Sequence, residues 1–232
     1  MFLSQLSLNT RSGDVHRDLA SPYEMHRTLM AAFPDKSAGG AGRVLYRIDI
    51  APDEDRPPVV LVQSEFAPNW DCLQERQYAS VTGPEAITYT ATKVEATGSD
   101  AVVVAREDRY RFRLVANPTV KRKVDGKKNG RRDACGTEEQ QLAWLIRKGE
   151  VGGFRLDMFE TNDGREVPNV TVVPLGKISS FRKKDHRTLS HQGVRFDGVL
   201  LVTDANLFLK SLTSGIGSAK AFGFGLLSVA RV

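Results

Sequence analysis

Two side chains near the N-terminus, Tyr23 and His26, have the types and the spacing that proton-transfer chemistry needs. An imidazole has an ordinary pKa of about 6.5, so it can give or take a proton near neutral pH. A tyrosine hydroxyl ordinarily keeps its proton and serves as a hydrogen-bond donor. In a helix, residues three apart are neighbours on one face. Spacing alone nevertheless favours a simpler explanation, in which His26 is a half-buried histidine and Tyr23 anchors a core helix.

The helix that must position this pair is predicted for residues 22–33. Ser21 and Glu24 have the spacing of a capping box, and Pro22 occupies the first helical position. Four apolar residues are expected to form the core face, with the histidine at its edge and the tyrosine farther round, so that the pair borders solvent. The expected core residues are Met25, Leu29, Ala32 and Phe33.

The remaining periodicity predicts an α+β fold. Residues 109–117 alternate three arginines with Tyr110, Phe112 and Leu114, which is typical of a strand with one buried face. The order of strand, helix, two strands, helix and strand is ferredoxin-like (RRM-like), and the second half repeats it more loosely. The first half is expected to have strands at 2–9, 43–50, 59–66 and 109–117 and helices at 22–33 and 71–80. The second half is expected to have helices at 137–148 and 205–213 and strands within 168–184, at 194–204 and at 223–230.

These elements predict two tandem ferredoxin-like domains, whose antiparallel sheets carry helices on one face. The N-terminal domain is expected to cover residues 1–118 and to carry the helix of Tyr23 and His26. Residues 119–136 are expected to be a basic loop or linker. Residues 137–232 would then form the C-terminal domain, with a basic hairpin and a glycine-rich loop.

The charge distribution indicates a polyanionic partner. The net charge is +5 and the isoelectric point is about 9.3. Residues 117–136 contain seven bases and two acids, so this stretch accounts for the whole excess. A second basic cluster spans residues 177–187. Either cluster could be a solvated loop, but two of them in one chain favour nucleic acid.

Other sequence features argue against several classes of protein. Cys72 and Cys135 lie far apart, so neither a zinc site nor a disulfide framework is indicated. No Asp, Glu and His cluster has metal-ligand spacing, and we expect no metal and no cofactor. No apolar run approaches the roughly 18 residues that span a membrane, and a signal peptide is not evident, so we expect a cytoplasmic protein without a membrane partner.

Three stretches together resemble the CasE family, the subunit of type I-E CRISPR surveillance complexes (Cascade) that processes the CRISPR RNA precursor. They are DLASPYEMHRTL (18–29), YRFRLVANPTVKRK (110–123) and GIGSAKAFGFGLLSVA (215–230). The resemblance implies a double ferredoxin-like fold and recognition of the stem-loop that the CRISPR repeat forms. It also implies one cut at the base of that stem, with the product retained in a complex with other Cascade subunits.

The resemblance also favours a catalytic role for Tyr23 and His26 over the purely structural one given above, because both fall where the family has active-site residues. Metal-independent RNA cleavage uses the 2′-hydroxyl as nucleophile and leaves a 2′,3′-cyclic phosphate and a 5′-hydroxyl. His26 is assigned as the main acid–base residue, which protonates the 5′-oxygen leaving group. Tyr23 would orient the 2′-hydroxyl or donate to a phosphate oxygen, and the identity of the base stays open. His16, His186 and His191 are expected to be surface residues.

Two further segments are expected to contact RNA. The glycine-rich loop could bring backbone amides close to a phosphate, with Lys220 adding charge, or it could be a tight connection packed under the sheet. The run from Arg182 to Lys184 matches the family's basic hairpin. The residues expected to bind RNA are Arg27, Arg111, Arg113, Lys121, Arg122, Lys127, Lys128, Arg131, Arg132, Arg182, Lys183, Lys184, Gly215, Gly217, Lys220, Gly223 and Gly225.

Two other functions remain open at this point. The first is a non-catalytic RNA-binding subunit of the same fold, in which His26 is incidental. The second is a structural module whose basic loop binds an acidic face of another protein subunit. A metal-dependent nuclease is a more distant third, because the ligand spacing is missing.

Overall fold

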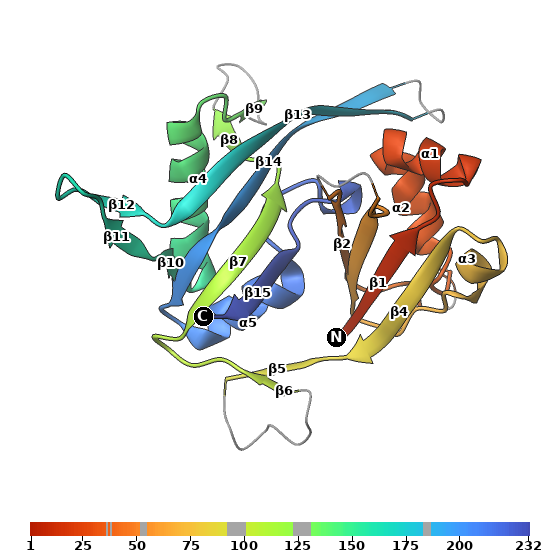
Figure 1. The fold of residues 1–232 in the computed structure, drawn as a ribbon, viewed down its shortest axis with the longest axis horizontal. Helices are drawn as coiled ribbons and strands as arrows, with labels where there is room; N and C mark the ends of the chain where they lie inside the picture. The colour runs from red at the N-terminus through yellow and green to blue at the C-terminus, as the bar shows by residue number, and fades with distance from the viewer. Residues whose placement is uncertain (36, 38, 52–54, 92–100, 123–130, 183–186) are drawn as a thin grey trace.

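The computed structural model describes residues 1–232 except 36, 38, 52–54, 92–100, 123–130 and 183–186, and the side chains of 101, 131, 180–182 and 187 are also left out. Two antiparallel sheets with helices lie side by side, the N-terminal one at the right of Figure 1 and the C-terminal one at the left. Within the described ranges, no helix is long and apolar enough to cross a membrane.

The first unit is a four-stranded sheet with the order β2-β3-β1-β4. Its strands are β1 (Phe2–Leu8), β2 (Val44–Asp49), β3 (Val59–Ser64) and β4 (Ala79–Ala86), and its helices are α1 (Gly13–Ala20), α2 (Pro22–Met30) and α3 (Asp71–Glu75). Leu6 and Leu8 from β1 meet Met25 and Leu29 from α2 in one core, and all four are almost fully buried. The apolar stripe of α2 therefore packs on the sheet as its sequence predicts.

The second unit has the strand order β10-β14-β7-β15, with β13 pairing to β14. Its strands are β7 (Arg109–Ala116), β10 (Phe154–Leu156), β13 (Val170–Arg182), β14 (Arg187–Val202) and β15 (Leu227–Arg231), and its helices are α4 (Glu138–Gly152) and α5 (Ala205–Ser214). Tyr110, Phe112 and Leu114 of β7 are buried in one core with Trp144 of α4 and Phe208 of α5. The predicted alternation of β7 is thus confirmed.

Both units share one topology. If the four main strands of each unit are numbered in chain order, each sheet has the order second, third, first, fourth. This is the ferredoxin-like arrangement, so the prediction of two tandem ferredoxin-like units is confirmed.

The fourth strand of the first unit was assigned to the wrong segment. Residues 109–117 were expected to close the first sheet, but β7 pairs with β14 and β15 in the second sheet. The first sheet is closed instead by β4, which pairs with β1 in a segment for which no strand was predicted. The strand pairing therefore moves the division between the units from residue 118 to a point before β7.

Several local predictions also need correction. Helix α1 was not predicted, and α2 ends at Met30 rather than at residue 33. The Ser21 side chain makes no cap hydrogen bond, and Glu24 pairs instead with Arg27 at 2.9 Å. In the second unit the helices have the side-chain caps that α2 lacks, because the side chains of Thr137 and Asp204 accept hydrogen bonds from backbone amides at the starts of α4 and α5.

Shorter elements extend the second unit. The predicted loop 119–136 begins and ends as an antiparallel pair, β8 (Thr119–Arg122) and β9 (Arg131–Ala134). A second antiparallel pair, β11 (Met158–Glu160) and β12 (Glu166–Pro168), precedes β13. The parallel pair β5 (Thr88–Thr90) and β6 (Ala101–Val103) lies between the units in the chain.

Polar contacts join the two units. Arg47 of β2 donates to Ser228 of β15 at 2.8 Å, and the Gln63 amide of β3 donates to the Leu212 carbonyl of α5 at 2.8 Å. Both Arg47 and Gln63 are buried. The relative position of the units is thus fixed by buried hydrogen bonds, which are costly to leave unmade.

Candidate active site

Helix α2 presents Tyr23 and His26 at the edge of its core face. Met25 and Leu29 are fully buried, whereas Tyr23 and His26 are half-buried. Burial lowers the pKa of His26 below its ordinary value, because desolvation disfavours the charged imidazolium. The neutral imidazole is therefore the main form of His26 at neutral pH in the free protein.

Two segments of the second unit approach this helix. Helix α2 contacts β13 and also the 3₁₀ helix η4 (Lys220–Phe222), which lies within the glycine-rich loop. Figure 1 shows the β13–β14 hairpin extending over the first unit toward α1 and α2. The structure thus brings together three of the sequence motifs, although they come from both halves of the chain.

The glycine-rich loop is a tight, packed connection. Gly225 donates its amide to the Val115 carbonyl at 2.7 Å, and its carbonyl accepts from Ile216 at 2.8 Å. A Cβ at Gly225 would lie 2.7 Å from the Ile216 carbonyl oxygen, and its φ of +90° also favours glycine. Gly217 faces the Trp144 ring, where a Cβ would lie 3.0 Å from the nearest ring atom. Of the two explanations offered by the sequence, the structure therefore supports a tight connection packed under the sheet. Contact of this loop with an RNA phosphate remains a prediction.

Lys220 is held within the loop. Its ammonium donates to the Ser214 carbonyl at the end of α5, at 2.6 Å. Burial lowers its pKa, and the nearby positive charges of Arg43 and Lys148 lower it further. An RNA phosphate would therefore compete with a helix carbonyl for this cation.

Tyr46 lies between α2 and the loop and is almost fully buried. Its hydroxyl is 3.2 Å from the Pro22 carbonyl of α2 and 3.3 Å from the Ala221 carbonyl of η4. Its ring faces Gly223, where a Cβ would lie 3.1 Å from a ring carbon. The sequence indicated Tyr46 only as a residue of the strand predicted at 43–50. Nothing in the sequence indicated that it contacts both α2 and the glycine-rich loop.

His191 was expected at the surface, and this prediction is wrong. It is half-buried on β14, and its ring lies 4.9 Å from the Phe222 ring of η4. Its Nδ1 is 3.3 Å from the Asn117 amide, whose oxygen accepts from the Gln192 backbone at 3.1 Å. Burial lowers the pKa of His191 as well. Asn117 follows directly after β7, so the end of this strand supports the loop through His191.

The other two histidines lie elsewhere. His16 is exposed on α1 rather than in a loop, with its Nε2 2.7 Å from the Thr10 carbonyl. His186 lies outside the described residues.

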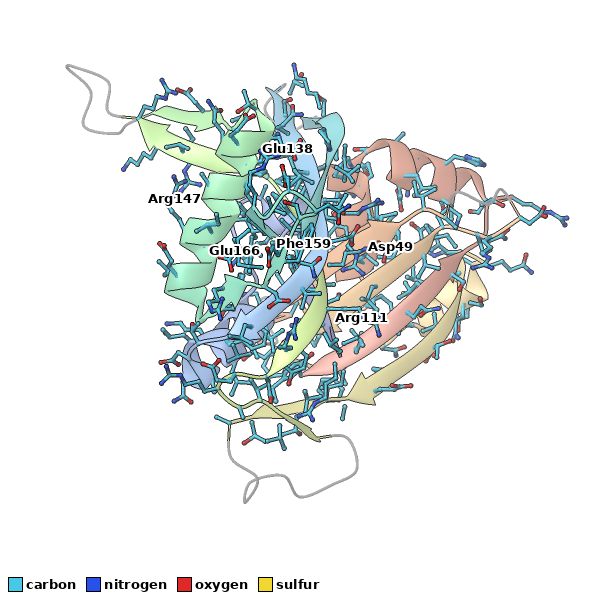
Figure 2. All side chains as sticks on the ribbon, turned by 60° about the vertical axis from the view of Figure 1, so that its left-hand side comes forward. Asp49, Arg111, Glu138, Arg147, Phe159 and Glu166 are labelled. Carbon is cyan, nitrogen blue, oxygen red and sulfur yellow. The ribbon has the colours of Figure 1, made fainter. Side chains whose placement is uncertain are left out.

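The arginine face of β7 is lined by carboxylates. Arg113 bonds Asp197 at 2.5 Å and lies 3.8 Å from Asp49, so its charge is already compensated. Arg111 is exposed, and with Arg113 it lines a cavity of about 610 Å³ that is formed mainly by residues of the second unit. Figure 2 labels Arg111 on β7 of the second unit and Asp49 at the end of β2 in the first unit. Of the two arginines, Arg111 is the more accessible to a phosphate.

The antiparallel pair β8–β9 carries exposed positive charge. Lys121 lies directly opposite Arg132 in the strand register, and both are exposed. Like charges opposite each other destabilise a strand pair, so this arrangement favours an anionic partner. Arg122 lies 3.5 Å from Asp133. Arg27, on α2, is exposed and pairs with Glu24.

Some predicted residues cannot be described. Lys127, Lys128, Lys183 and Lys184 lie outside the described residues. Arg131 begins β9 and Arg182 ends β13, but their side chains are not described. Among the residues that are described, no group of three or more His, Cys, Asp or Glu side chains could hold a metal ion.

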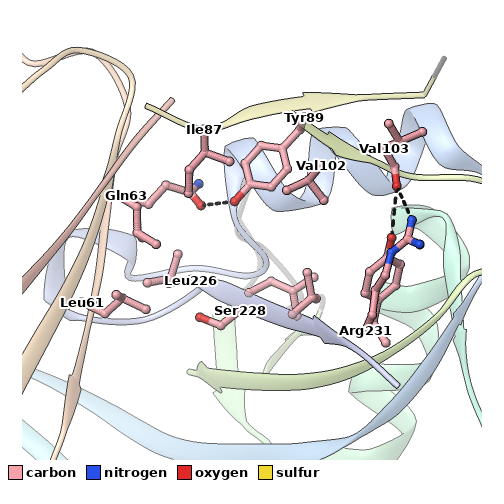
Figure 3. Close-up of a pocket in the computed structure, with 13 residues that line it drawn as sticks. Leu61, Gln63, Ile87, Tyr89, Val102, Val103, Leu226, Ser228 and Arg231 are labelled. Carbon is pink, nitrogen blue, oxygen red and sulfur yellow. Dashed lines mark hydrogen bonds between the residues drawn. The ribbon is translucent and has the colours of Figure 1, made fainter. Parts of the chain in front are cut away.

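Another cavity between the units is remote from this chemistry. It measures about 710 Å³ and is lined mainly by apolar side chains, with Tyr89 donating to Gln63 at 3.4 Å and Arg231 donating to the Val103 carbonyl at 3.0 Å (Figure 3). None of the residues predicted for the site lines it.

These features define a class of tandem ferredoxin-like proteins in which a histidine and a tyrosine on the first crossover lie beside a glycine-rich loop of the second unit. The family model described as CRISPR associated protein matches residues 1–231. The chain therefore belongs to the CRISPR associated protein family, and the resemblance to CasE is confirmed.

Individual relatives agree with this assignment. The CRISPR-associated endoribonuclease Cse3 of Thermus thermophilus is 39% identical over 234 residues, 99% of this chain and 100% of that protein. The Cascade subunit CasE of Escherichia coli is 32% identical over 126 residues, 51% of this chain and 56% of that protein. A structure of Cse3 bound to a 19-nt RNA matches with a TM-score of 0.80 and 39% identity, covering 100% of both chains. Cas6e of Escherichia coli, at 24% identity and a TM-score of 0.63 over 100% of both chains, shares the fold.

Proposed function

We propose that this protein is a metal-independent endoribonuclease that cuts the repeat hairpin of the CRISPR RNA precursor and stays bound to the product within a Cascade-type complex. The observation that carries this proposal is the full-length similarity to Cse3, an endoribonuclease with solved structures bound to RNA, one of them representing a pre-cleavage complex. The compartment would be the cytoplasm, where the precursor is made.

The proposed chemistry needs proton transfer and charge stabilisation. The 2′-hydroxyl gives its proton to a general base and attacks the adjacent phosphorus, the bond from phosphorus to the 5′-oxygen breaks, and a 2′,3′-cyclic phosphate and a 5′-hydroxyl result. His26 protonates the leaving 5′-oxygen, while Tyr23 orients the 2′-hydroxyl or donates to a phosphate oxygen. Support comes from the half-buried position of both side chains on one face of α2, next to η4 and β13.

RNA binding is proposed for the basic elements of the second unit. The exposed side chains of Lys121 and Arg132 on β8–β9 would contact stem phosphates, together with Lys183 and Lys184 of the segment between β13 and β14, which lies outside the described residues. The deep, narrow major groove of A-form RNA prevents direct recognition of bases, so shape and phosphate contacts would dominate.

The test is cleavage of a labelled repeat hairpin by the purified protein in excess EDTA. We expect one cut at the base of the stem, a 2′,3′-cyclic phosphate on the 5′ fragment, and no loss of rate in EDTA. A 2′-deoxy substitution at the nucleotide 5′ of the scissile phosphate should abolish cutting and leave binding unchanged. Loss of cutting in EDTA, or normal cutting of the deoxy substrate, would contradict the mechanism.

A further inference from the structure

A buried tyrosine hydroxyl joins the two units next to the helix of His26, and the proposed chemistry does not use it. Tyr46 is a residue of β2 in the first unit, and Ala221 lies 175 positions later in η4 of the second unit. The Tyr46 hydroxyl is nearly equidistant from the carbonyls of Pro22 and Ala221, at 3.2 and 3.3 Å. A hydroxyl has one hydrogen, so the two carbonyls share a single donor.

The Pro22 carbonyl has a direct relation to the catalytic histidine. In an α-helix the carbonyl of a residue accepts from the amide four residues later, so Pro22 is the backbone acceptor for His26. Pro22 is also the first residue of α2 and is buried. The Tyr46 hydroxyl therefore holds the turn of helix from which His26 projects. Since burial raises the pKa of Tyr46, the hydroxyl remains a donor over the whole useful pH range.

The other end of this contact is fixed within the second unit. The Phe222 ring packs on His191, and Phe222 donates its amide to the Ala219 carbonyl at 2.9 Å. Lys220 bonds the end of α5 at 2.6 Å. The Ala221 carbonyl is thus part of a segment held on both sides, and Tyr46 connects α2 to a fixed point rather than to a mobile loop.

We infer that Tyr46 is a positioning residue, which sets the distance between the helix of His26 and the glycine-rich loop by sharing its hydroxyl between the Pro22 and Ala221 carbonyls. This inference rests on the proposed function. A misplacement of about 1 Å can cost 10²-fold in rate, so loss of the hydroxyl should slow the chemical step. RNA affinity should not change, because Tyr46 is buried and cannot touch RNA.

The test is Tyr46→Phe, which keeps the ring and removes the hydroxyl. We expect the single-turnover cleavage rate at saturating protein to fall about 10- to 100-fold. The dissociation constant for a 2′-deoxy hairpin should stay the same. Tyr110→Phe is the control, since Tyr110 is equally buried and its hydroxyl lies 3.1 Å from the Asp108 carboxylate and 3.4 Å from the Val103 carbonyl, at the cavity remote from the site. That variant should cleave at the wild-type rate. Both are assayed at a temperature at which circular dichroism shows them folded.

A double-mutant cycle separates positioning from general destabilisation. If Tyr46 acts through His26, Tyr46→Phe should slow the residual cleavage of His26→Ala no further. An unchanged rate in Tyr46→Phe, a loss confined to the dissociation constant, or an undiminished loss in the His26→Ala background would overturn the inference. Failure of the wild-type protein to cut in EDTA would instead contradict the proposed function, so the two failures are distinguishable.

Discussion

The two ferredoxin-like units have the same strand order but differ in what their connections carry. In the first unit, α1, α2 and α3 are the helices between the strands. In the second unit, β8–β9 precedes the first helix, β11–β12 and the long strand β13 lie between the second strand, β10, and the third, β14, and the glycine-rich loop precedes the last strand. The candidate acid–base residues lie on the first unit, and most of the predicted RNA-binding residues lie on the second unit.

This difference separates two physical requirements. Proton transfer needs side chains held to a fraction of an ångström, which a helix packed on a sheet provides. Binding an RNA stem needs charges spread over a larger surface, which hairpins that project from the sheet provide. The division of roles predicts that changes in the first unit alter the rate of cutting, whereas changes in the second unit alter affinity.

The largest expected effect belongs to His26. In His26→Ala we expect the single-turnover rate to fall about 10²- to 10⁴-fold, because this is the usual contribution of a positioned acid or base. Affinity for the uncut hairpin should remain at the wild-type value. The measurement is cleavage at saturating protein, combined with a filter-binding titration.

His16→Ala is the control for this variant, since His16 is exposed on the neighbouring helix α1. It should cut normally. If His26→Ala cuts as fast as the wild-type protein, His26 is not the acid–base residue. If neither protein cuts, the chain is a non-catalytic RNA-binding subunit.

An intermediate effect is expected from charge removal in the second unit. Lys121→Gln should weaken hairpin binding and reduce the slope of log affinity against log salt by about 1, because one phosphate contact is lost. The cleavage rate at saturation should be unchanged. Arg113→Gln serves as the comparison, because the Arg113 side chain bonds Asp197 at 2.5 Å.

We expect Arg113→Gln to change the salt slope less than Lys121→Gln and to lower the midpoint of urea unfolding. Equal slopes for the two variants would mean that Arg113 exchanges its carboxylate partners for phosphate. Wild-type affinity in Lys121→Gln would remove β8–β9 from the binding surface.

The division of the fold was only partly predictable from the sequence. Hydrophobic alternation identified β7, and helix-start signals located α2, α4 and α5. Periodicity cannot tell which strand pairs with which, so β7 was assigned to the first sheet although it pairs with β14 and β15. Helix α1 escaped prediction because it has eight residues, four of them charged or histidine, and Val15 is the one apolar residue it buries.

The site was predictable to a similar degree. The shared face of Tyr23 and His26 follows from their spacing, and the structure confirms that both border solvent. The contact of Tyr46 with Ala221 spans 175 positions, and no local pattern can indicate it. His191 was expected to be exposed because its neighbours are polar and basic, yet packing against Phe222 and Phe224 buries much of its ring.

The smallest expected effect is on the pH dependence of cleavage, which shows whether His26 acts as the acid or as the base. Burial lowers the pKa of His26 in the free protein, so the bend in kcat/KM should lie below the ordinary value of about 6.5. If His26 is the acid, kcat/KM falls as the pH rises through this bend. The bend in kcat should lie at higher pH, because the scissile phosphate in the complex favours the imidazolium.

His26→Ala should lose both bends. A rate that rises with pH through the bend would make His26 the base and leave protonation of the 5′-oxygen to Tyr23.

The same pKa shift has a consequence for stability. The unfolded chain binds a proton at His26 more readily than the folded protein, so the free energy of unfolding should decrease as the pH falls from about 6.5 through the lower folded pKa. Urea unfolding at several pH values, with His26→Ala as the reference, measures this contribution, and an identical pH dependence in both proteins would mean that the imidazole is not desolvated on α2.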